Sequence, residues 1–235
     1  MNLIKNIDAK TYKNNSFSTI TETIINDLEL NLYIDNSYNT SLYTIPDNID
    51  ILLTGYIFYK FKKIINDFSI QKNKDNFDVY VNLKDIETKT LFQNVPDFIT
   101  PSLVLESYFD FNNNSSLFRQ TAGVHNSALY IDNNREIFLE DISRQSVILK
   151  MVGYLIKKNL FNRNVVIITS SRVNNEIIDI IDSLNIKLLL SRATISFSGL
   201  ENAKLKDMTI IGFIKQDRFT VFCGDKRIKL NCESK

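Results

Sequence analysis

The chain of 235 residues contains one histidine, His125, in the stretch QTAGVHNSALYI. Its imidazole could act as a metal ligand, a general base, a substrate contact or a packed side chain. One kind of catalytic zinc site requires H-x-E followed by P-C-x-x-C, but Asn126 and Ser127 follow this histidine and no cysteine lies near it. Because a zinc site takes three or more His, Cys or carboxylate ligands, we predict that the chain binds no zinc. No G-x-S-x-G segment supports a Ser-His-Asp triad.

Three Ser-Arg dipeptides form a second pattern with chemical potential, at 143–144, 171–172 and 191–192. The last two each follow an apolar run that predicts a buried strand and precede a predicted helix, and the first opens a predicted helix. In a parallel sheet, such loops share the carboxyl edge, where ligands usually bind. Serine hydroxyls, helix N-terminal amides and arginine side chains together suit phosphate or another anion. The residues concerned are Ser143, Arg144, Ser171, Arg172, Ser191 and Arg192.

A simpler interpretation of each dipeptide is that the serine caps a helix and the arginine lies on the surface. Three acids lie close to these positions in sequence, Glu140, Asp141 and Glu176. They could hold the arginines or receive the edge of a guanine-type base, or they could only offset a helix dipole. The sequence leaves both interpretations open.

The second part of the chain alternates strand and helix patterns, and these elements must position the three dipeptides. Residues 143–159 carry an apolar stripe at helical spacing. The alternation predicts an α/β layer with a mostly parallel sheet. Strands are predicted at 125–131, 135–142, 164–172, 186–194, 208–214 and 218–223, with the first two joined by an Asp-Asn-Asn turn, and a further helix is predicted at 174–184.

The first hundred residues have mostly strand character. A hairpin is predicted over 28–45, a short helix over 46–61 and a strand over 76–83. Pro96 and Pro101 mark the boundary of the two parts. The sequence therefore predicts a smaller β-rich N-terminal domain, residues 1–97, and an α/β domain, residues 98–235.

Composition limits the function further. The 28 basic and 27 acidic residues nearly cancel, so net charge gives no reason to expect nucleic acid as a partner. No apolar run approaches the length of a membrane span, and the N-terminus lacks the apolar core of a secretion signal, so we expect a cytoplasmic protein that binds no membrane. Cys223 and Cys232, with eight residues between them, fit neither a disulfide framework nor a CxxC site.

Taken together, the segments of the chain resemble the FdhD/NarQ family of formate dehydrogenase accessory proteins, or sulfur carriers. YTIPDNIDILLTGYIF is similar to the family's T-x-x-D-x-x-x-L-x-x-G-[FY] segment, and LFRQTAGVHNSALY to F-x-x-T-G-G-x-H-x-A. LEDISRQSVILKMVG resembles E-D-I-G-R-H-N-A-x-D-K-x-x-G, and ITSSRVNNEII resembles S-G-R-x-S-x-E. TIIGFIKQDRFTVF is similar to the terminal G-F-x-x-x-x-R-x-x-V-Y segment. The order and spacing agree over most of the chain.

The resemblance implies a deaminase-like α/β fold without the deaminase metal site. It implies that the protein passes sulfur from a cysteine desulfurase to a molybdenum cofactor, the bis-molybdopterin guanine dinucleotide, which serves formate dehydrogenase, and that it forms a homodimer. Phe213, Ile214, Lys215, Gln216, Asp217 and Arg218 would contact the cofactor. The pocket for this cofactor or a guanine nucleotide would also include Thr121, Gly123, His125, Glu140, Asp141, Arg144, Ser170, Ser171, Arg172, Glu176, Ser191 and Arg192.

The chain departs from the family pattern where the reactive cysteines are expected. The family carries them in a C-x-x-C-type loop ahead of the T-G-G segment, but residues 84–101 contain no cysteine. Cys223 is the remaining candidate thiol, and it could equally be a packed cysteine. Several motif glycines are also replaced, for example by Ala122, Ser143 and Ser171, which could narrow the pocket.

Three functions follow as alternatives. The chain is a divergent accessory protein that binds the cofactor with weakened or lost sulfur transfer, or a sulfurtransferase that uses Cys223 or a partner's thiol. The third is a nucleotide-binding module or scaffold unrelated to molybdenum.

Overall fold

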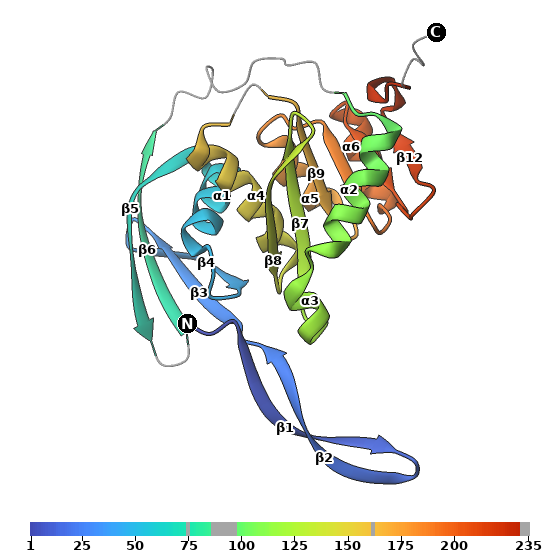
Figure 1. Ribbon diagram of the computed structural model, residues 1–235. Coiled ribbons are helices and arrows are strands. Elements are labelled where there is room, and N and C mark those ends of the chain that lie inside the picture. The colour runs from blue at the N-terminus through green and yellow to red at the C-terminus, as the bar shows by residue number, and fades with distance from the viewer. Residues whose placement is uncertain (74–75, 86–97, 161–162, 231–235) are drawn as a thin grey trace.

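The computed structural model describes residues 1–73, 76–85, 98–160 and 163–230 (Figure 1). The described strands form a two-stranded ribbon, a four-stranded sheet and a six-stranded sheet. The boundary predicted near residue 97 lies outside the described residues, and the division into two domains stays a prediction. None of the described helices is long and apolar enough to cross a membrane.

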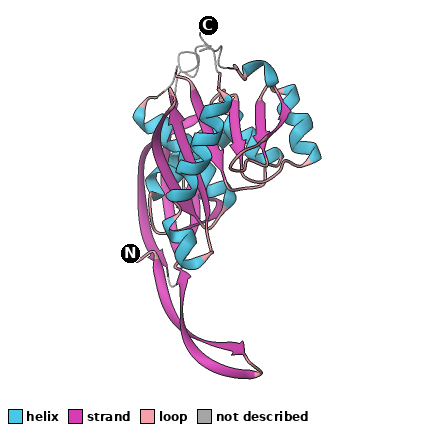
Figure 2. Cartoon of the chain, turned by 45° about the vertical axis from the view of Figure 1, so that its right-hand side comes forward, coloured by secondary structure: helices cyan, strands magenta, loops and turns pink. Residues whose placement is uncertain are grey.

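The ribbon projects from the body of the molecule as an arm (Figures 1 and 2). Its strands, β1 (Ile4–Lys13) and β2 (Ser16–Ile25), pair antiparallel over their whole length. Most of its side chains are exposed, so the sequence lacks the apolar alternation that would have predicted it. At the base of the ribbon, β2 packs beside the short helix α3 (Ser116–Thr121), and Ile25 lies next to Gly123.

The four-stranded sheet has the order β4-β3-β6-β5. The predicted hairpin is confirmed as an antiparallel pair, and the predicted strand over 76–83 is confirmed as an inner strand of this sheet. The predicted short helix is confirmed as α1, which follows the hairpin. The elements are β3 (Leu28–Ile34), β4 (Ser37–Thr44), α1 (Ile49–Phe61), β5 (Lys63–Asn73) and β6 (Asn76–Asp85).

The six-stranded sheet has the order β12-β11-β10-β9-β7-β8. Its strands, and the helices predicted over 143–159 and 174–184, lie close to the predicted ranges. The strands are β7 (His125–Ile131), β8 (Asn134–Asp141), β9 (Val165–Thr169), β10 (Leu188–Ser191), β11 (Thr209–Gly212) and β12 (Thr220–Cys223). The helices are α2 (Pro101–Asn113), α3 (Ser116–Thr121), α4 (Arg144–Lys158), α5 (Asn175–Asp182) and α6 (Phe197–Leu205), and a 3-10 turn, η2, covers Asp225–Arg227.

The prediction of a mostly parallel sheet is wrong, because two neighbouring pairs are parallel and three are antiparallel. Strands β8 to β11 run in one direction, as strand–helix alternation predicts. The tight turn at 132–133 forces β7 to run against β8, and β7 then inserts between β8 and β9. The fold is mixed α/β, and its likeness to the deaminase layer stays a prediction.

Alternate side chains of the six-stranded sheet point to its two faces and pack in two separate hydrophobic cores. Leu129, Ile167 and Leu189 pack in the larger core, with α1, α4, α5 and the four-stranded sheet. Their neighbours in sequence point to the opposite face, which α2 covers through Val104 and Phe111. The sequence did not predict α2, although Thr100 caps it and Pro101 begins it, a typical helix start.

Helices α1 and α4 cross at a pair of glycines. A Cβ added to Gly55 would collide with the Leu149 carbonyl oxygen, and one added to Gly153 would collide with the Ile51 carbonyl oxygen. Because neither residue has a side chain, the two backbones are in direct contact. This crossing joins the four-stranded sheet to the six-stranded layer.

Replacing Gly153 by alanine should lower the free energy of unfolding by about 3 kcal/mol or more, since overpacking against a rigid backbone is costly. In an ordinary exposed helix position the same change would stabilise by roughly 1 kcal/mol. Denaturant unfolding followed by circular dichroism measures the difference. Gly123→Ala is the matched control, because its Cβ would meet side chains and no backbone atom, Ile25 at 3.1 Å and Thr121 at 3.5 Å. Equal stability of the two variants would contradict the crossing.

Candidate functional site

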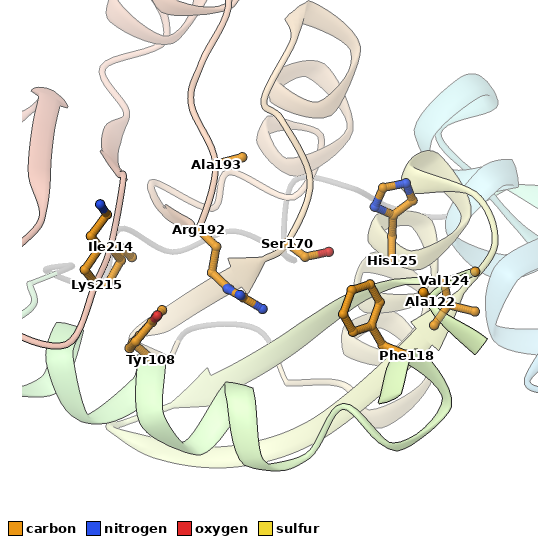
Figure 3. Close-up of a pocket in the computed structure, with 11 residues that line it drawn as sticks. Tyr108, Phe118, Ala122, Val124, His125, Ser170, Arg192, Ala193, Ile214 and Lys215 are labelled. Carbon is orange, nitrogen blue, oxygen red and sulfur yellow. The ribbon is translucent and has the colours of Figure 1, made fainter. Parts of the chain in front are cut away.

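One edge of the six-stranded sheet collects the residues that the sequence singled out. The ends of β8, β9, β10 and β11 and the start of β7 meet there, because β7 runs opposite to its neighbours. This topology brings His125, Ser170 and Arg192 close together (Figure 3). Two pockets open at this edge.

The first pocket, here called the aromatic cleft, has a volume of about 600 Å³. Figure 3 shows Tyr108 and Lys215 on one side, Phe118 and His125 on the other, and Arg192 between them. The Arg192 guanidinium lies 5.8 Å from the centre of the Tyr108 ring, a cation–π contact. The full lining is Tyr108, Phe118, Ala122, Gly123, Val124, His125, Ser170, Arg192, Ala193, Ile214 and Lys215.

The second pocket, here called the arginine pocket, has a volume of about 390 Å³ and a polar lining. It lies where α4 and α5 begin. Ser143 caps α4 by accepting a hydrogen bond from the Ser146 amide, and Asn174 caps α5 in the same way from the Ile177 amide. Its lining is His125, Ile142, Ser143, Arg144, Gln145, Arg172, Asn174 and Ile177.

His125 lines both pockets. It begins β7 and is half-buried. Burial lowers the pKa of this imidazole, and the nearby charges of Arg144 and Arg172 lower it further. Its ordinary value is about 6.5, so the side chain is neutral at pH 7.

The arginines at 172 and 192 were expected to share one crevice. Instead Arg172 lines the arginine pocket and Arg192 the aromatic cleft, and the two pockets meet at His125. Among the described residues, neither guanidinium is paired with a carboxylate. Their charges are therefore available to an anion.

The serine hydroxyls mostly serve the fold. Ser171 and Ser191 are buried, and the Ser191 hydroxyl donates to the Ser171 carbonyl oxygen at 2.8 Å. This bond joins two neighbouring strand ends. Ser170 does line the aromatic cleft, and its hydroxyl accepts a hydrogen bond from the Asn126 amide.

Glu140 lies outside both pockets. Its carboxylate accepts hydrogen bonds from the Leu117 and Phe118 amides, at 2.9 and 3.0 Å, and from the Ser116 hydroxyl. This acid therefore holds the start of α3, which carries Phe118 into the aromatic cleft. We assign it a positioning role in place of the predicted contact with a base.

Asp141 is also internal to the fold. It is fully buried and accepts hydrogen bonds from the Thr44 hydroxyl at 2.6 Å and from the Ser143 amide at 3.2 Å. Its ion pair with the buried Lys150 is 2.6 Å long. Burial raises the pKa of Asp141, and the Lys150 ammonium opposes that rise. The third acid, Glu176, accepts a hydrogen bond from the Gln145 side chain.

The segment Phe213–Arg218 forms the turn between β11 and β12. Ile214 and Lys215 line the aromatic cleft, whereas Gln216, Asp217 and Arg218 line neither pocket. The Lys215 amide donates to the Arg218 carbonyl oxygen and closes the turn. Phe213 is half-exposed and packs on Phe222.

In the other predicted motif, Gly123 lines the cleft and its amide donates to the Thr121 hydroxyl at 3.1 Å. Sequence reasoning missed Tyr108 and Phe118 because it missed their helices. It also missed the cap residue Asn174. The signals for finding them were the helix start at Thr100-Pro101 and the Asn ahead of an apolar helix.

Cys223 lies away from both pockets. It pairs with Ile210 near the start of β11, whereas the cleft residues follow the end of that strand. Its thiol donates to the Met208 carbonyl oxygen, and burial raises the pKa of the thiol. Cys232 and most of residues 84–101 lie outside the described residues.

Within the described part of the chain, no group of three or more His, Cys, Asp or Glu side chains could hold a metal ion. The prediction about zinc stays a prediction.

Comparison with known proteins identifies relatives of this chain. The model of the FdhD/NarQ family matches residues 80–229. The sulfur carrier protein FdhD of Staphylococcus haemolyticus is 31% identical over 133 residues, which is 56% of this chain and 50% of that protein. The alignment thus spans half of that relative. The sulfur carrier protein FdhD of Wolinella succinogenes is 24% identical over 91% of this chain and 85% of that protein.

A solved structure described as a formate dehydrogenase accessory protein from Desulfotalea psychrophila has a TM-score of 0.81 to this chain. The superposed region covers 97% of this chain and 100% of the other chain, with 17% sequence identity. The likeness shows that the two proteins share a mixed α/β fold.

The buried ion pair yields a prediction about the frame of the site. Lys150→Met should lower the free energy of unfolding by about 3–5 kcal/mol, because it leaves the Asp141 carboxylate buried without its partner. The double variant with Asp141→Asn should recover part of that loss. Denaturant unfolding of both variants measures the difference. Wild-type stability of Lys150→Met would show that the pair contributes nothing.

Proposed function

The chain belongs to the FdhD/NarQ family of sulfur carriers and formate dehydrogenase accessory proteins, and from that premise we propose that it binds a nucleotide-bearing molybdenum cofactor in the aromatic cleft. The client would be formate dehydrogenase. The source of sulfur in such a system would be a cysteine desulfurase. We also propose that the protein works as a homodimer.

One observation carries the proposal: aromatic side chains line the same cleft as two cations that have no carboxylate partner among the described residues. Tyr108 and Phe118 bring aromatic rings to the cleft, where a planar base could pack, and Arg192 and Lys215 bring positive charge for phosphates (Figure 3). The volume of about 600 Å³ lies within the usual range of small-molecule sites. These residues fit the guanine nucleotide part of the cofactor.

The roles of the residues follow from their positions. Arg192 would hold a phosphate while its guanidinium stays against Tyr108, which fixes its direction. Phe118 would face the base, held in place by the Glu140 carboxylate on its amide. When bound, the cofactor would supply a molybdenum centre to which sulfur is attached.

Of the functions found in the family, sulfur carriage on a cysteine has the least support in the residues of this chain. Residues 84–101 contain no cysteine, and a thiolate is the form that accepts sulfur. Cys223 lies outside both pockets with a raised pKa, so little of it is thiolate at pH 7. We therefore propose that this protein binds and delivers the cofactor, with sulfur transfer lost or dependent on a partner's thiol.

A second candidate is a nucleotide-binding module or scaffold with no link to sulfur or molybdenum. The absence of cysteine from 84–101 favours it. Binding of guanine nucleotide without any effect on formate dehydrogenase would distinguish it from the first proposal.

Arg192→Ala should weaken GDP binding by about 1.5–3 kcal/mol, the usual contribution of hydrogen bonds to a charged group. Lysine at this position should restore only part of the loss, because it lacks the two-pronged guanidinium. Isothermal titration calorimetry with GDP and ADP measures both effects.

Arg163→Ala is the matched control, since Arg163 pairs with Asp132 at the far end of β9. It should leave GDP affinity unchanged. Failure of the wild-type protein to bind either nucleotide at millimolar concentration would contradict the proposed cleft.

Incubation with a cysteine desulfurase and labelled cysteine should leave little persulfide on the protein, because residues 84–101 contain no cysteine and Cys223 lies outside both pockets. Mass spectrometry of the intact chain measures the label, and Cys223→Ser should give the same result. Near-stoichiometric labelling of Cys223 would instead establish this residue as a sulfur carrier.

A further inference from the structure

We infer that the arginine pocket is a site for a tetrahedral oxyanion, such as a phosphate group, and that His125 takes up a proton when the anion binds. The inference deepens the proposed function, because the phosphate could belong to the cofactor or be free. It rests on the lining of this pocket.

Two cations share the lining of the pocket. Arg144 and Arg172 both line it, and both act electrostatically on His125. Arg144 also occupies the first turn of α4, where the helix dipole disfavours positive charge. The aromatic cleft, which shares His125 with this pocket, contributes two further positive charges, Arg192 and Lys215. Like charges gathered in this way are stabilised by a bound anion.

The acids near His125 do not balance these charges. Asp141 stands opposite His125 in the β7–β8 pair, but its carboxylate is engaged by Lys150, Thr44 and the Ser143 amide. On α5, the Glu176 carboxylate keeps its charge, because its partner Gln145 is neutral, but it does not line the pocket. In the described residues, neither arginine has an acidic partner, and no carboxylate lines the pocket.

Neutral donors complete the site. Gln145 and Asn174 line the pocket beside the beginnings of α4 and α5. The cap side chains bind the Ser146 and Ile177 amides, and the preceding amides of each first turn have no partner within the helix. Arginines with amide donors suit a phosphate or sulfate.

The proton uptake follows from the same charges. In the free protein, burial and the two arginines hold the pKa of His125 below its ordinary value, so the ring is neutral at pH 7. A doubly charged anion beside the ring reverses the local field and raises that pKa. Anion affinity therefore increases as pH falls from the pKa of the bound state to that of the free state. Below the latter it no longer changes.

The chain has one histidine, so its imidazole gives one resonance pair in a proton NMR spectrum. The pH titration of that signal in sulfate should have a midpoint about one unit higher than in chloride of equal ionic strength. Sulfate is chosen because its own charge is constant over this pH range. Equal midpoints in the two salts would overturn the inference.

Variants locate the effect. Arg144→Gln and Arg172→Gln should each reduce the sulfate-induced shift, because each removes a ligand of the anion. Arg163→Gln should keep the full shift, since Arg163 is exposed, pairs with Asp132 and lines neither pocket. A shift that survives loss of both pocket arginines would place the anion elsewhere and overturn the assignment.

Nucleotides distinguish the source of the phosphate. If a nucleotide in the aromatic cleft reaches this pocket, GDP alone should shift the signal, guanosine should not, and sulfate should add nothing further. If the ligand is a free phosphate, GDP should leave the sulfate shift intact. A sulfate shift in a protein that binds no GDP would support this site while the proposed function fails.

Discussion

The contact between Gly55 and Gly153 sets the position of α4 at the ligand edge, the edge of the six-stranded sheet where the two pockets open. Two helices cross at this contact without side chains between them, so α4 is fixed to α1 within the larger core. Two hydrogen bonds then join the four-stranded sheet to the start of α4 and to the end of β8, the strand that precedes it. Ser146 donates to the Tyr43 carbonyl oxygen at 2.6 Å, and Thr44 donates to Asp141. The N-terminal sheet thus determines where α4 begins and where Arg144 lies.

The direction of β7 explains why a single histidine contacts two pockets. Strands β8 to β11 end at the ligand edge, and β7 is the inserted strand that starts there. Its first residue, His125, therefore stands between the loop after β9 and the start of α4. In a fully parallel sheet the same residue would lie at the opposite edge. The feature that made the sequence prediction wrong is the one that assembles the site.

Local sequence patterns predicted the local structure well. They failed where the outcome depends on which strands pair or on which distant residues bind a side chain. The two predicted hairpins, β3–β4 and β7–β8, and the helices α1, α4 and α5 follow from turn residues and apolar spacing. Strand direction depends on which strands become neighbours, and spacing along the chain does not encode that. Glu140 and Asp141 have the chemistry of ligand contacts, but partners distant in sequence, Leu117 and Thr44, engage them inside the fold. The pocket side chains of α2 and α3 were missed with their helices.

The distribution of charge, and not its sum, gives the ligand edge its character. The chain is almost neutral, with 28 basic and 27 acidic residues. Near the pockets, however, Glu140 accepts hydrogen bonds from backbone amides, and Asp141 forms an ion pair with Lys150. The two pockets are lined by Arg144, Arg172 and Arg192. A buried acid that is fully bonded stabilises the frame but is screened from the ligand by its own partners. The exposed guanidiniums then dominate the local field. A nearly neutral protein can in this way gather cations around two pockets, because the fold pairs the nearby buried acids with other groups and leaves the three arginines in the pocket linings.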